Sequence, residues 1–355
     1  MKRNPPSKEL YNIPWSTNEF NGMPYRILGR SGLRVSNVGL GTWKFGYPET
    51  GDGSRVSATT AFQIFDLAVD LGVTFWDTAN RYNAASGNSE RVIGDWLELN
   101  PGQRRNLVIA TKLYGGMDGL TPNHSHLSRM NILDSVYASL DRLGITYIDL
   151  LYFHAYDLET PIEESLCAID DLIHQDLVRY FAVSNFSVNQ IQQYQELEKH
   201  ISPRTRIVAV QNQFNILDKE SPEIADVLNY CAAERISFVA YSPLGRGLLT
   251  TRYLDQQKIG KGDRLYDEKT LENDLTDSKT RIVKQLNEIA QRYGLELSQM
   301  VLAYMLTLPG MGPVIPASST VEQLRSNAAS GKISLSADLC AEIATVVTQI
   351  DQYAQ

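Results

Sequence analysis

The sequence predicts an α/β protein built as a single (β/α)8 TIM barrel. From residue 37 onward, short apolar runs alternate with segments of helical periodicity, and eight such runs occur. Strands that alternate with helices favour a parallel sheet, and eight is the number of strands that closes into a barrel. The chain has 355 residues, a length that fits one barrel of roughly 250 residues or more, or two smaller domains.

Eight runs have the length and composition of buried strands. Each is short and apolar, and a segment with helical spacing of apolar residues separates it from the next. The expected strands are Asn37–Leu40, Thr74–Trp76, Leu107–Ala110, Ile148–Phe153, Tyr180–Val183, Val208–Val210, Ser237–Ala240 and Gly312–Ile315.

Helix-starting and helix-ending residues mark the segments between the strands. Gly72 follows Ala58–Leu71, and a glycine in that position commonly ends a helix. Gly144 follows Asn131–Leu143 in the same way. Proline followed by acidic residues predicts the start of a helix over Pro161–Gln175. The remaining expected helices are Ser187–Glu198, Ser221–Ala233, Lys279–Tyr293, Ser298–Leu308, Val321–Ser330 and the C-terminal Ser336–Gln352.

The barrel domain is expected to carry two additions. Residues 23–355 are assigned to the barrel with its C-terminal helix, and residues 1–22 to a mobile N-terminal extension. Residues 245–278, after the seventh strand, form a long polar segment with several arginines and lysines. Because a loop of that length in a compact domain is usually functional, we expect it to take part in binding.

A doubly wound sheet is the competing architecture. Such a sheet is expected to show G-x-G-x-x-G after an early strand. The nearest segment is Gly39–Lys44, in which Lys44 occupies the place of the third glycine. The chain also has no Tyr-x-x-x-Lys pair, the pair expected of a short-chain dehydrogenase type of site, so the barrel is favoured.

Charge and composition exclude several classes of function. Lys and Arg number 33 and Asp and Glu 41, which gives a net charge of −8. An acidic protein is a poor match for nucleic acid or anionic membrane. The sequence shows no signal peptide and no uninterrupted apolar stretch long enough for membrane insertion, so a cytoplasmic location is expected.

The sequence offers neither a disulfide framework nor a metal site. Cys167, Cys231 and Cys340 are few and odd in number, and each lies among helix-forming residues, which favours reduced thiols. His124 and His126 form an H-x-H pair in a polar segment without a third ligand. We therefore expect no bound metal.

Four polar residues stand at or just after the ends of the second, third and fourth expected strands. Asp77, Lys112 and His154 close these strands, and Tyr82 follows in a polar loop. Reacting groups of barrel enzymes lie at the C-terminal strand ends. A buried Lys112 requires a carboxylate partner, which Asp77 can supply. The paired lysine is expected to lower the pKa of the Tyr82 phenol and make it a proton donor. His154 can hydrogen-bond the same substrate oxygen, an arrangement suited to carbonyl reduction.

These four residues, in this order, resemble the catalytic tetrad of the aldo-keto reductase superfamily. The flanking segments agree with the family in order: YRILGRSGLRVSNVGLGTW at Tyr25–Trp43, LVIATK at Leu107–Lys112, SLDRLGITYIDLLYFH at Ser139–His154 and YSPLGRGLLT at Tyr241–Thr250. The similarity extends over about residues 23–350. It is closest to the bacterial-type branch related to potassium-channel β-subunits.

The resemblance implies NADPH as the cofactor and leaves NADH open. The family's nicotinamide site would be formed here by Ser184, Asn185, Gln211 and Tyr241, the last stacking on the ring. The expected phosphate and adenosine contacts are Ser242, Leu244, Arg252, Arg264, Ser318, Gln323 and Asn327. The aromatic residues Trp43, Tyr114 and Tyr156 are expected to line the substrate pocket.

The expected activity is reduction of small aldehydes or ketones, sugar-derived ones included, with Tyr82 as general acid. Two alternatives remain open: NAD(P)-dependent oxidation of a sugar or aldose at the same site, and a cofactor-binding regulatory subunit of a membrane partner. The expected partner is a small-molecule carbonyl substrate, neither nucleic acid nor a bilayer interior, and the sequence leaves homo-oligomerisation open.

Overall fold

Eight parallel strands form the barrel in the computed structural model, which describes residues 12–349. The strands follow one another around the sheet in chain order. Parallel bridges join Val38 to Val314 and Gly41 to Ala317, so the first and last strands also meet. The predicted barrel is thus confirmed. The strands are β4 (Leu40–Gly41), β7 (Phe75–Asp77), β8 (Val108–Leu113), β9 (Ile148–Phe153), β10 (Val178–Ser184), β11 (Ile207–Gln213), β12 (Ser237–Tyr241) and β13 (Met311–Ile315).

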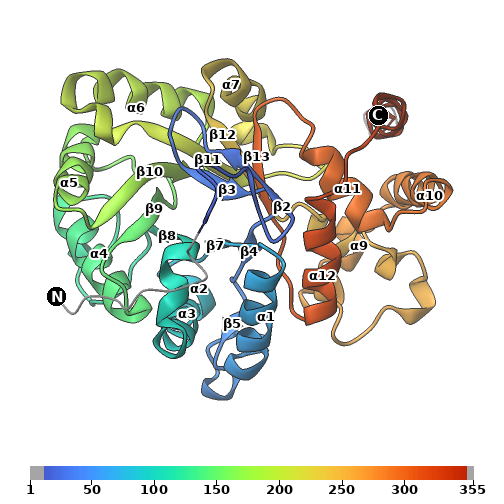
Figure 1. Ribbon diagram of the computed structural model, residues 1–355, viewed down its shortest axis with the longest axis horizontal. Helices are drawn as coiled ribbons and strands as arrows, with labels where there is room; N and C mark the ends of the chain where they lie inside the picture. Colours follow the sequence, from blue (N-terminus) through green and yellow to red (C-terminus); the bar gives the residue numbers. More distant parts are fainter. Residues whose placement is uncertain (1–11, 350–355) are drawn as a thin grey trace.

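Helices surround the barrel on its outer side (Figure 1). Each predicted helix is present within a few residues of its expected bounds, although α7 begins six residues later than its expected start at Ser221. The last predicted helix extends to Gln352, beyond the described residues. The long helices are α1 (Ala58–Asp70), α3 (Asn88–Leu99), α4 (Arg129–Leu143), α5 (Ile162–His174), α6 (Val188–Ile201), α7 (Val227–Glu234), α10 (Asp277–Arg292), α11 (Leu297–Met305), α12 (Val321–Ser330) and α13 (Ala337–Thr348).

Helix α3 was not predicted, because its first turn is polar although it is buried. Ser89 and Glu90 are fully buried at its start, where a sequence pattern indicates a loop. Gly94, which lowers helix propensity, lies in its centre at the contact with α4. A Cβ atom there would stand 2.4 Å from the carbonyl oxygen of Arg142, so the close packing of the two helices requires glycine.

An antiparallel sheet covers the N-terminal end of the barrel, where β2 and β3 cross its centre in Figure 1. The Tyr25 hydroxyl lies 2.5 Å from that of Thr74, just before β7. Arg26 donates to the carbonyl oxygens of Met311 and Gly312, each at 2.8 Å, at the start of β13. The sheet therefore ties the barrel shut at the end opposite the strand C-termini. Its strands are β1 (Glu19–Phe20), β2 (Met23–Ile27) and β3 (Arg34–Ser36).

The N-terminal extension was predicted to comprise residues 1–22 and to be mobile. Residues 1–11 of it lie outside the described residues. Phe20 pairs with Met23 in the antiparallel sheet, so the end of this segment is held against the barrel domain. Mobility of the remainder stays a prediction.

Two apolar layers stabilise the barrel. The inner layer fills its interior with side chains such as Phe75, Tyr152 and Val239, and is closed from below by Leu28 and Val35 of the N-terminal sheet. The outer layer lies between strands and helices. Full burial of one large apolar side chain stabilises by about 1.5–3 kcal/mol, so the two layers fix the strand ends that carry the polar groups.

The predicted long loop after β12 folds against the segment that follows β4. It contains the short helices α8 (Arg264–Asp267) and α9 (Leu271–Asp274). The Arg264 guanidinium lies over the Trp43 ring, 4.9 Å from its centroid. Asp267 pairs with Arg55, which lies just before β6 (Val56–Ser57), at 3.5 Å. The loop thus spans the C-terminal side of the barrel from β12 toward β4.

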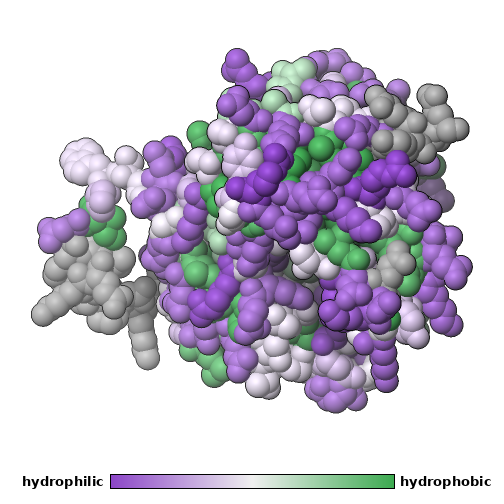
Figure 2. All heavy atoms as spheres, turned by 90° about the vertical axis from the view of Figure 1, so that its right-hand side faces the viewer, coloured by the Kyte–Doolittle hydropathy of each residue, from purple (hydrophilic) through white to green (hydrophobic). Residues whose placement is uncertain are grey.

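The molecular surface over α9, α10 and α12 is mostly hydrophilic, with apolar side chains in small separate areas (Figure 2). In the part of the chain that the structure describes, no helix combines the length and the apolar character that a bilayer crossing requires.

Candidate active site

A cavity of about 860 Å³ lies at the C-terminal ends of the strands. Asp77, His154, Ser184, Gln211 and Tyr241 line it from β7, β9, β10, β11 and β12 or from the residue directly after the strand. The other lining residues that the sequence predicted are Trp43, Tyr82, Asn185, Ser242, Leu244, Arg264, Gln323 and Asn327.

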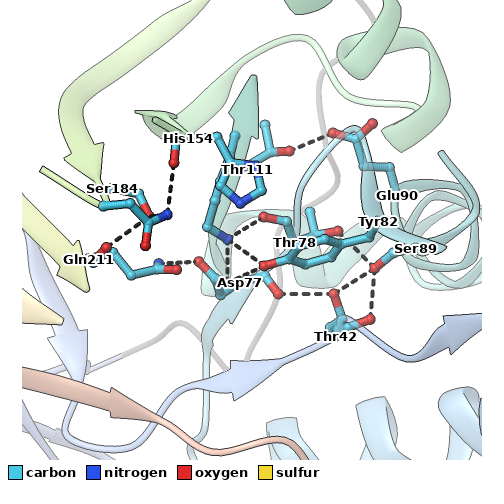
Figure 3. A network of polar contacts seen from close by, with 12 residues as sticks. Thr42, Asp77, Thr78, Tyr82, Ser89, Glu90, Thr111, His154, Ser184 and Gln211 are labelled. Carbon is cyan, nitrogen blue, oxygen red and sulfur yellow. Dashed lines mark hydrogen bonds and ion pairs between the residues drawn. The ribbon is translucent and has the colours of Figure 1, made fainter. Parts of the chain in front are cut away.

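Lys112 lies beneath the cavity and uses all three of its ammonium protons. Its Nζ is 2.6 Å from Oδ1 of Asp77, 2.8 Å from the carbonyl oxygen of Thr78 and 2.9 Å from the Tyr82 phenol oxygen. Lys112 is 1% exposed and Asp77 2%, so the ion pair is shielded from water. The second Asp77 oxygen accepts a hydrogen bond from Nε2 of Gln211 at 2.7 Å. Figure 3 shows Asp77 at the centre of these contacts.

The Tyr82 phenol oxygen therefore accepts a hydrogen bond from Lys112, and the phenol's own proton remains available for another partner. Its distance to Oδ1 of Asp77 is 3.5 Å, long for an O–H···O bond, which is usually 2.5–3.0 Å. The phenol proton is thus only weakly held inside the protein. The side chain faces the cavity, where this proton can reach a substrate oxygen.

The prediction that Lys112 lowers the pKa of Tyr82 is wrong. Burial first, and then the negative charge of Asp77, raise the pKa of the phenol well above its usual value. The lysine charge is balanced by a carboxylate 2.6 Å away, so the phenol faces a neutral pair instead of a bare cation. Tyr82 consequently remains protonated at physiological pH.

A left-handed turn follows Tyr82 in the short helix α2 (Tyr82–Ala85). Asn83, Ala84 and Ala85 have φ values of 56°, 56° and 60°, a conformation that costs roughly 1–2 kcal/mol for each residue with a side chain. The Asn83 amide donates to the carbonyl oxygen of Phe45 at 2.6 Å and holds the turn in place. This local strain is maintained by the packing around Tyr82.

His154 presents a neutral imidazole to the cavity. Burial, followed by the positive charges of Lys112 and Arg81, lowers its pKa to about 3. Its ring lies edge-on to that of Tyr82, with centroids 6.0 Å apart. The imidazole can therefore form a hydrogen bond near the phenol without carrying charge.

Buried polar contacts hold α3 against the strands that carry Asp77 and Lys112 (Figure 3). The Ser89 hydroxyl lies 2.8 Å from the hydroxyls of Thr42 and Thr78. The Thr111 hydroxyl donates to Glu90 at 2.6 Å, and Arg142 pairs with the same carboxylate at 2.7 Å. These contacts fix the backbone on both sides of the Lys112–Asp77 pair.

Polar groups from β10, β11 and β12 form a second cluster beside His154. The Asn185 amide donates to the carbonyl oxygen of His154 at 2.9 Å and accepts from the Tyr241 hydroxyl at 2.9 Å. The Ser184 hydroxyl donates to the backbone carbonyl of Gln211 at 2.8 Å. The structure thus brings together the four residues expected at the nicotinamide.

The far end of the cavity has groups that suit phosphate. Arg246 and Arg264 line it. Residues 242–247 contain four positions with positive φ, and turns of this kind direct backbone N–H groups into anion-binding concavities. Gln323 lines the cavity from the first turn of α12, and a helix N-terminus attracts anions. Polar amides therefore lie at one end of the cavity and cationic groups at the other.

Besides Lys112, four predicted site residues do not line the cavity. Arg252 points to Asp263 and forms an ion pair with it. Ser318 is buried and accepts a hydrogen bond from the Asn327 amide at 3.0 Å. Tyr114 stacks on His126, and Tyr156 donates to Gln193 at 2.6 Å. Neither aromatic residue is among those that line the cavity.

Several cavity residues were not predicted. Arg81 directly precedes Tyr82, and its position next to the expected proton donor was a usable signal. Arg246 follows β12, and a cation in that long polar loop could have been selected. The remaining polar ones have no sequence feature of their own that singles them out, although Thr250 ends the YSPLGRGLLT segment. They are Gln213, Thr250, Glu268, Ser298 and Ser326.

The described residues contain no group of three or more His, Cys, Asp or Glu side chains placed to hold a metal ion. His124 instead contacts the Thr121 hydroxyl at 3.0 Å, and His126 stacks on Tyr114.

Known proteins resemble this chain over most of its length. A profile of the Aldo/keto reductase family matches residues 37–348. Versiconal hemiacetal acetate reductase of Aspergillus parasiticus is 30% identical over 309 residues, which cover 82% of this chain and 88% of that protein. A probable voltage-gated potassium channel subunit beta of Oryza sativa subsp. japonica is 30% identical over 308 residues, 86% of this chain and 90% of that protein.

Proposed function

The chain belongs to the aldo/keto reductase family, and from this premise we propose that it reduces small aldehydes or ketones to alcohols with NADPH. Tyr82 is the proton donor in this proposal. The main observation in its support is the contact between Nζ of Lys112 and the Tyr82 phenol oxygen, which are 2.9 Å apart. This contact lies beside a cavity that the neutral His154 also lines.

Lys112 orients the proposed general acid. Because its ammonium donates to the phenol oxygen, the phenol must direct its own proton elsewhere, toward the cavity. As negative charge develops on the substrate oxygen, the phenol passes its proton to that oxygen. The phenolate that forms is then stabilised by the ammonium 2.9 Å away.

His154 positions the carbonyl oxygen in this scheme. With a pKa of about 3, the imidazole is neutral and does not compete with Tyr82 as an acid. One ring nitrogen can donate a hydrogen bond to the same oxygen that Tyr82 protonates. Two donors at one oxygen polarise the carbonyl and fix its orientation.

Bound NADPH would supply the hydride. Ser184, Asn185 and Gln211 would hold its carboxamide, since their side chains line one end of the cavity. Arg264 and the first turn of α12 would bind phosphate at the other end. Gln323 stands where other branches of the family often have a cation, so the preference for NADPH over NADH depends on the arginines of the long loop.

The protonation state of Tyr82 favours reduction over the alternative of oxidation. Oxidation of an alcohol needs a base to accept the hydroxyl proton, and a phenol with a raised pKa is a weak source of phenolate. Reduction needs the protonated form, which burial stabilises. Catalysis in the reductive direction is therefore the better fit.

A regulatory role is the second candidate, because one relative is described as a probable channel subunit. That relative and the reductase have the same identity to this chain, 30%, so similarity does not separate the two functions. Measured catalytic turnover distinguishes the enzyme from the regulatory subunit.

The test is a screen of aldehydes, ketones and aldoses with NADPH and, separately, with NADH. The loss of absorbance of the reduced cofactor measures turnover. The corresponding alcohols, assayed with NADP⁺, test the oxidative direction. We expect faster reduction than oxidation at neutral pH. Tight cofactor binding without turnover on any compound would contradict the proposed enzyme and favour the regulatory role.

A further inference from the structure

Arg81 places a cation at the catalytic end of the cavity, and this cation has no role in the proposed proton transfer. It lines the cavity together with Tyr82 and His154. Its charge is among the causes that lower the pKa of His154, so the guanidinium is electrostatically close to the imidazole.

Two glycines hold the Arg81 side chain in this place. Its Nη1 donates to the carbonyl oxygen of Gly116. A Cβ atom on Gly115 would lie 2.5 Å from Cδ and 2.9 Å from Nε of Arg81. Any other residue at 115 would therefore displace the arginine, and the loop after β8 acts as a support for it.

The other two arginines of the cavity each have a carboxylate partner and lie at its phosphate end, whereas Arg81 has no carboxylate partner among the described residues. Arg246 pairs with Asp274 at 3.1 Å and Arg264 with Glu268 at 3.0 Å. Within residues 12–349, the recorded contact of the Arg81 guanidinium is the neutral carbonyl of Gly116, and no carboxylate pairs with it. A guanidinium has five N–H donors, so most of its donors are available to a ligand.

We propose that Arg81 binds an anionic group of the substrate, so that this protein acts on aldehydes or ketones that carry a carboxylate or a phosphate. The inference rests on the proposed reductase function. Guanidinium recognises both groups by paired, charge-assisted hydrogen bonds. The anionic group lies on the substrate chain beyond the carbonyl, on the side of the cavity formed by Arg81.

The test compares matched substrate pairs with saturating NADPH. The carboxylate arm uses 4-oxobutanoate against butanal, and the phosphate arm uses glyceraldehyde 3-phosphate against glyceraldehyde. The readout is the ratio of kcat/KM for the charged compound to that for its uncharged partner, because the ratio cancels effects on the shared chemical step. The variants are Arg81→Ala and Arg81→Lys, with Arg105→Ala as the control for loss of one exposed positive charge near the opposite end of β8.

Arg81→Ala is expected to lower the ratio roughly 10–100-fold in at least one arm, the effect of losing charge-assisted hydrogen bonds. Arg81→Lys should lower it less, because the charge remains while the paired geometry is lost. Arg105→Ala should leave both ratios unchanged. The arm that responds identifies carboxylate or phosphate.

A wild-type enzyme that reduces both members of each pair, with ratios that Arg81→Ala does not change, overturns the inference and leaves the reductase function intact. In that outcome Arg81 merely holds the loop at Gly116, and its replacement lowers the melting temperature without changing the ratios. If no compound is reduced with either NADPH or NADH, the reductase function is rejected, and this inference is rejected with it.

Discussion

At the scale of single residues, the site depends on how the protons of Lys112 are shared. Its ammonium has three donors, and the structure supplies three acceptors at 2.6–2.9 Å. Because no donor is left over, the orientation of the Tyr82 hydroxyl is determined by a residue that does not itself line the cavity.

Asp77→Asn is expected to destabilise the protein and to lower turnover. The amide would leave the charge of Lys112 unbalanced and could direct an N–H group at the ammonium or at Gln211. Breaking a buried ion pair typically costs about 3–5 kcal/mol. Urea unfolding and steady-state kinetics measure both effects.

The control is Asp66→Asn, an exposed carboxylate on α1 that accepts from Trp96 at 2.9 Å. It should change stability by less than about 1 kcal/mol. If Asp77→Asn were equally mild and kept its turnover, the ion pair would not have the role assigned to it.

Because His154 is neutral in the folded protein, we expect the free energy of unfolding to decrease at acidic pH. Its pKa is about 3 in the folded protein and about 6.5 in an unfolded chain. Above pH 6.5 both states are neutral, and as the pH falls from 6.5 toward 3 only the unfolded state gains the proton. Stability is thus lost over that window, by about 2 kcal/mol at pH 5.

Urea unfolding of the wild type and His154→Gln at pH 7.5 and pH 5 measures this contribution. The wild type should lose about 2 kcal/mol more than the variant between the two pH values. The other four histidines are common to both proteins and cancel. Equal losses would show that His154 is not buried in its neutral form.

At the scale of elements, the long loop after β12 borders the cavity, but one of its two arginines expected to bind the cofactor points elsewhere. The sequence indicated a binding loop from its length, polarity and cations, and the structure folds part of it over the cavity. It could not indicate the direction of each side chain. Thr250 caps the turn Thr251–Tyr253, and this turn directs Arg252 to Asp263 while Arg264 lines the cavity.

Arg264→Ala and Arg252→Ala therefore form a matched pair. Loss of Arg264 should weaken NADPH binding roughly 10–100-fold, since charge-assisted bonds to phosphate are worth about 1.5–3 kcal/mol. Loss of Arg252 should change it by less than about threefold, because exposed ion pairs contribute little. Fluorescence titration gives both dissociation constants. Equal weakening by the two substitutions would mean that the loop binds the cofactor in another arrangement.

Helix α3 shows where periodicity fails as a guide. Its first turn contains Ser89 and Glu90, whose partners are threonines on other elements and Arg142 on α4. A sequence pattern treats such residues as exposed, because their burial depends on contacts distant in the chain. The same contacts fix the strand ends beside Asp77, so the unpredicted helix supports the predicted site.

At the scale of the whole molecule, alternation of strands and helices was enough to predict the barrel and the strand ends that meet in one cavity. The N-terminal sheet was not predicted, because its strands are short and its contacts with the barrel join residues that are distant in the sequence. Arg26 contacts the carbonyl of Met311, 285 residues away, and no local pattern encodes that pairing. The raised pKa of Tyr82 was missed for a similar reason, since burial is a property of the assembled fold.

In the proposed reaction, Tyr82 donates the proton while NADPH would supply the hydride for carbonyl reduction. The most direct measurement is kcat of Tyr82→Phe beside its dissociation constant for NADPH, with Tyr137→Phe, on the exposed side of α4, as the control. We expect kcat to fall roughly 10²–10⁴-fold, with NADPH binding nearly unchanged and with no effect in the control. A Tyr82→Phe protein that keeps more than about half of its turnover would contradict it, since general acids contribute far more than that.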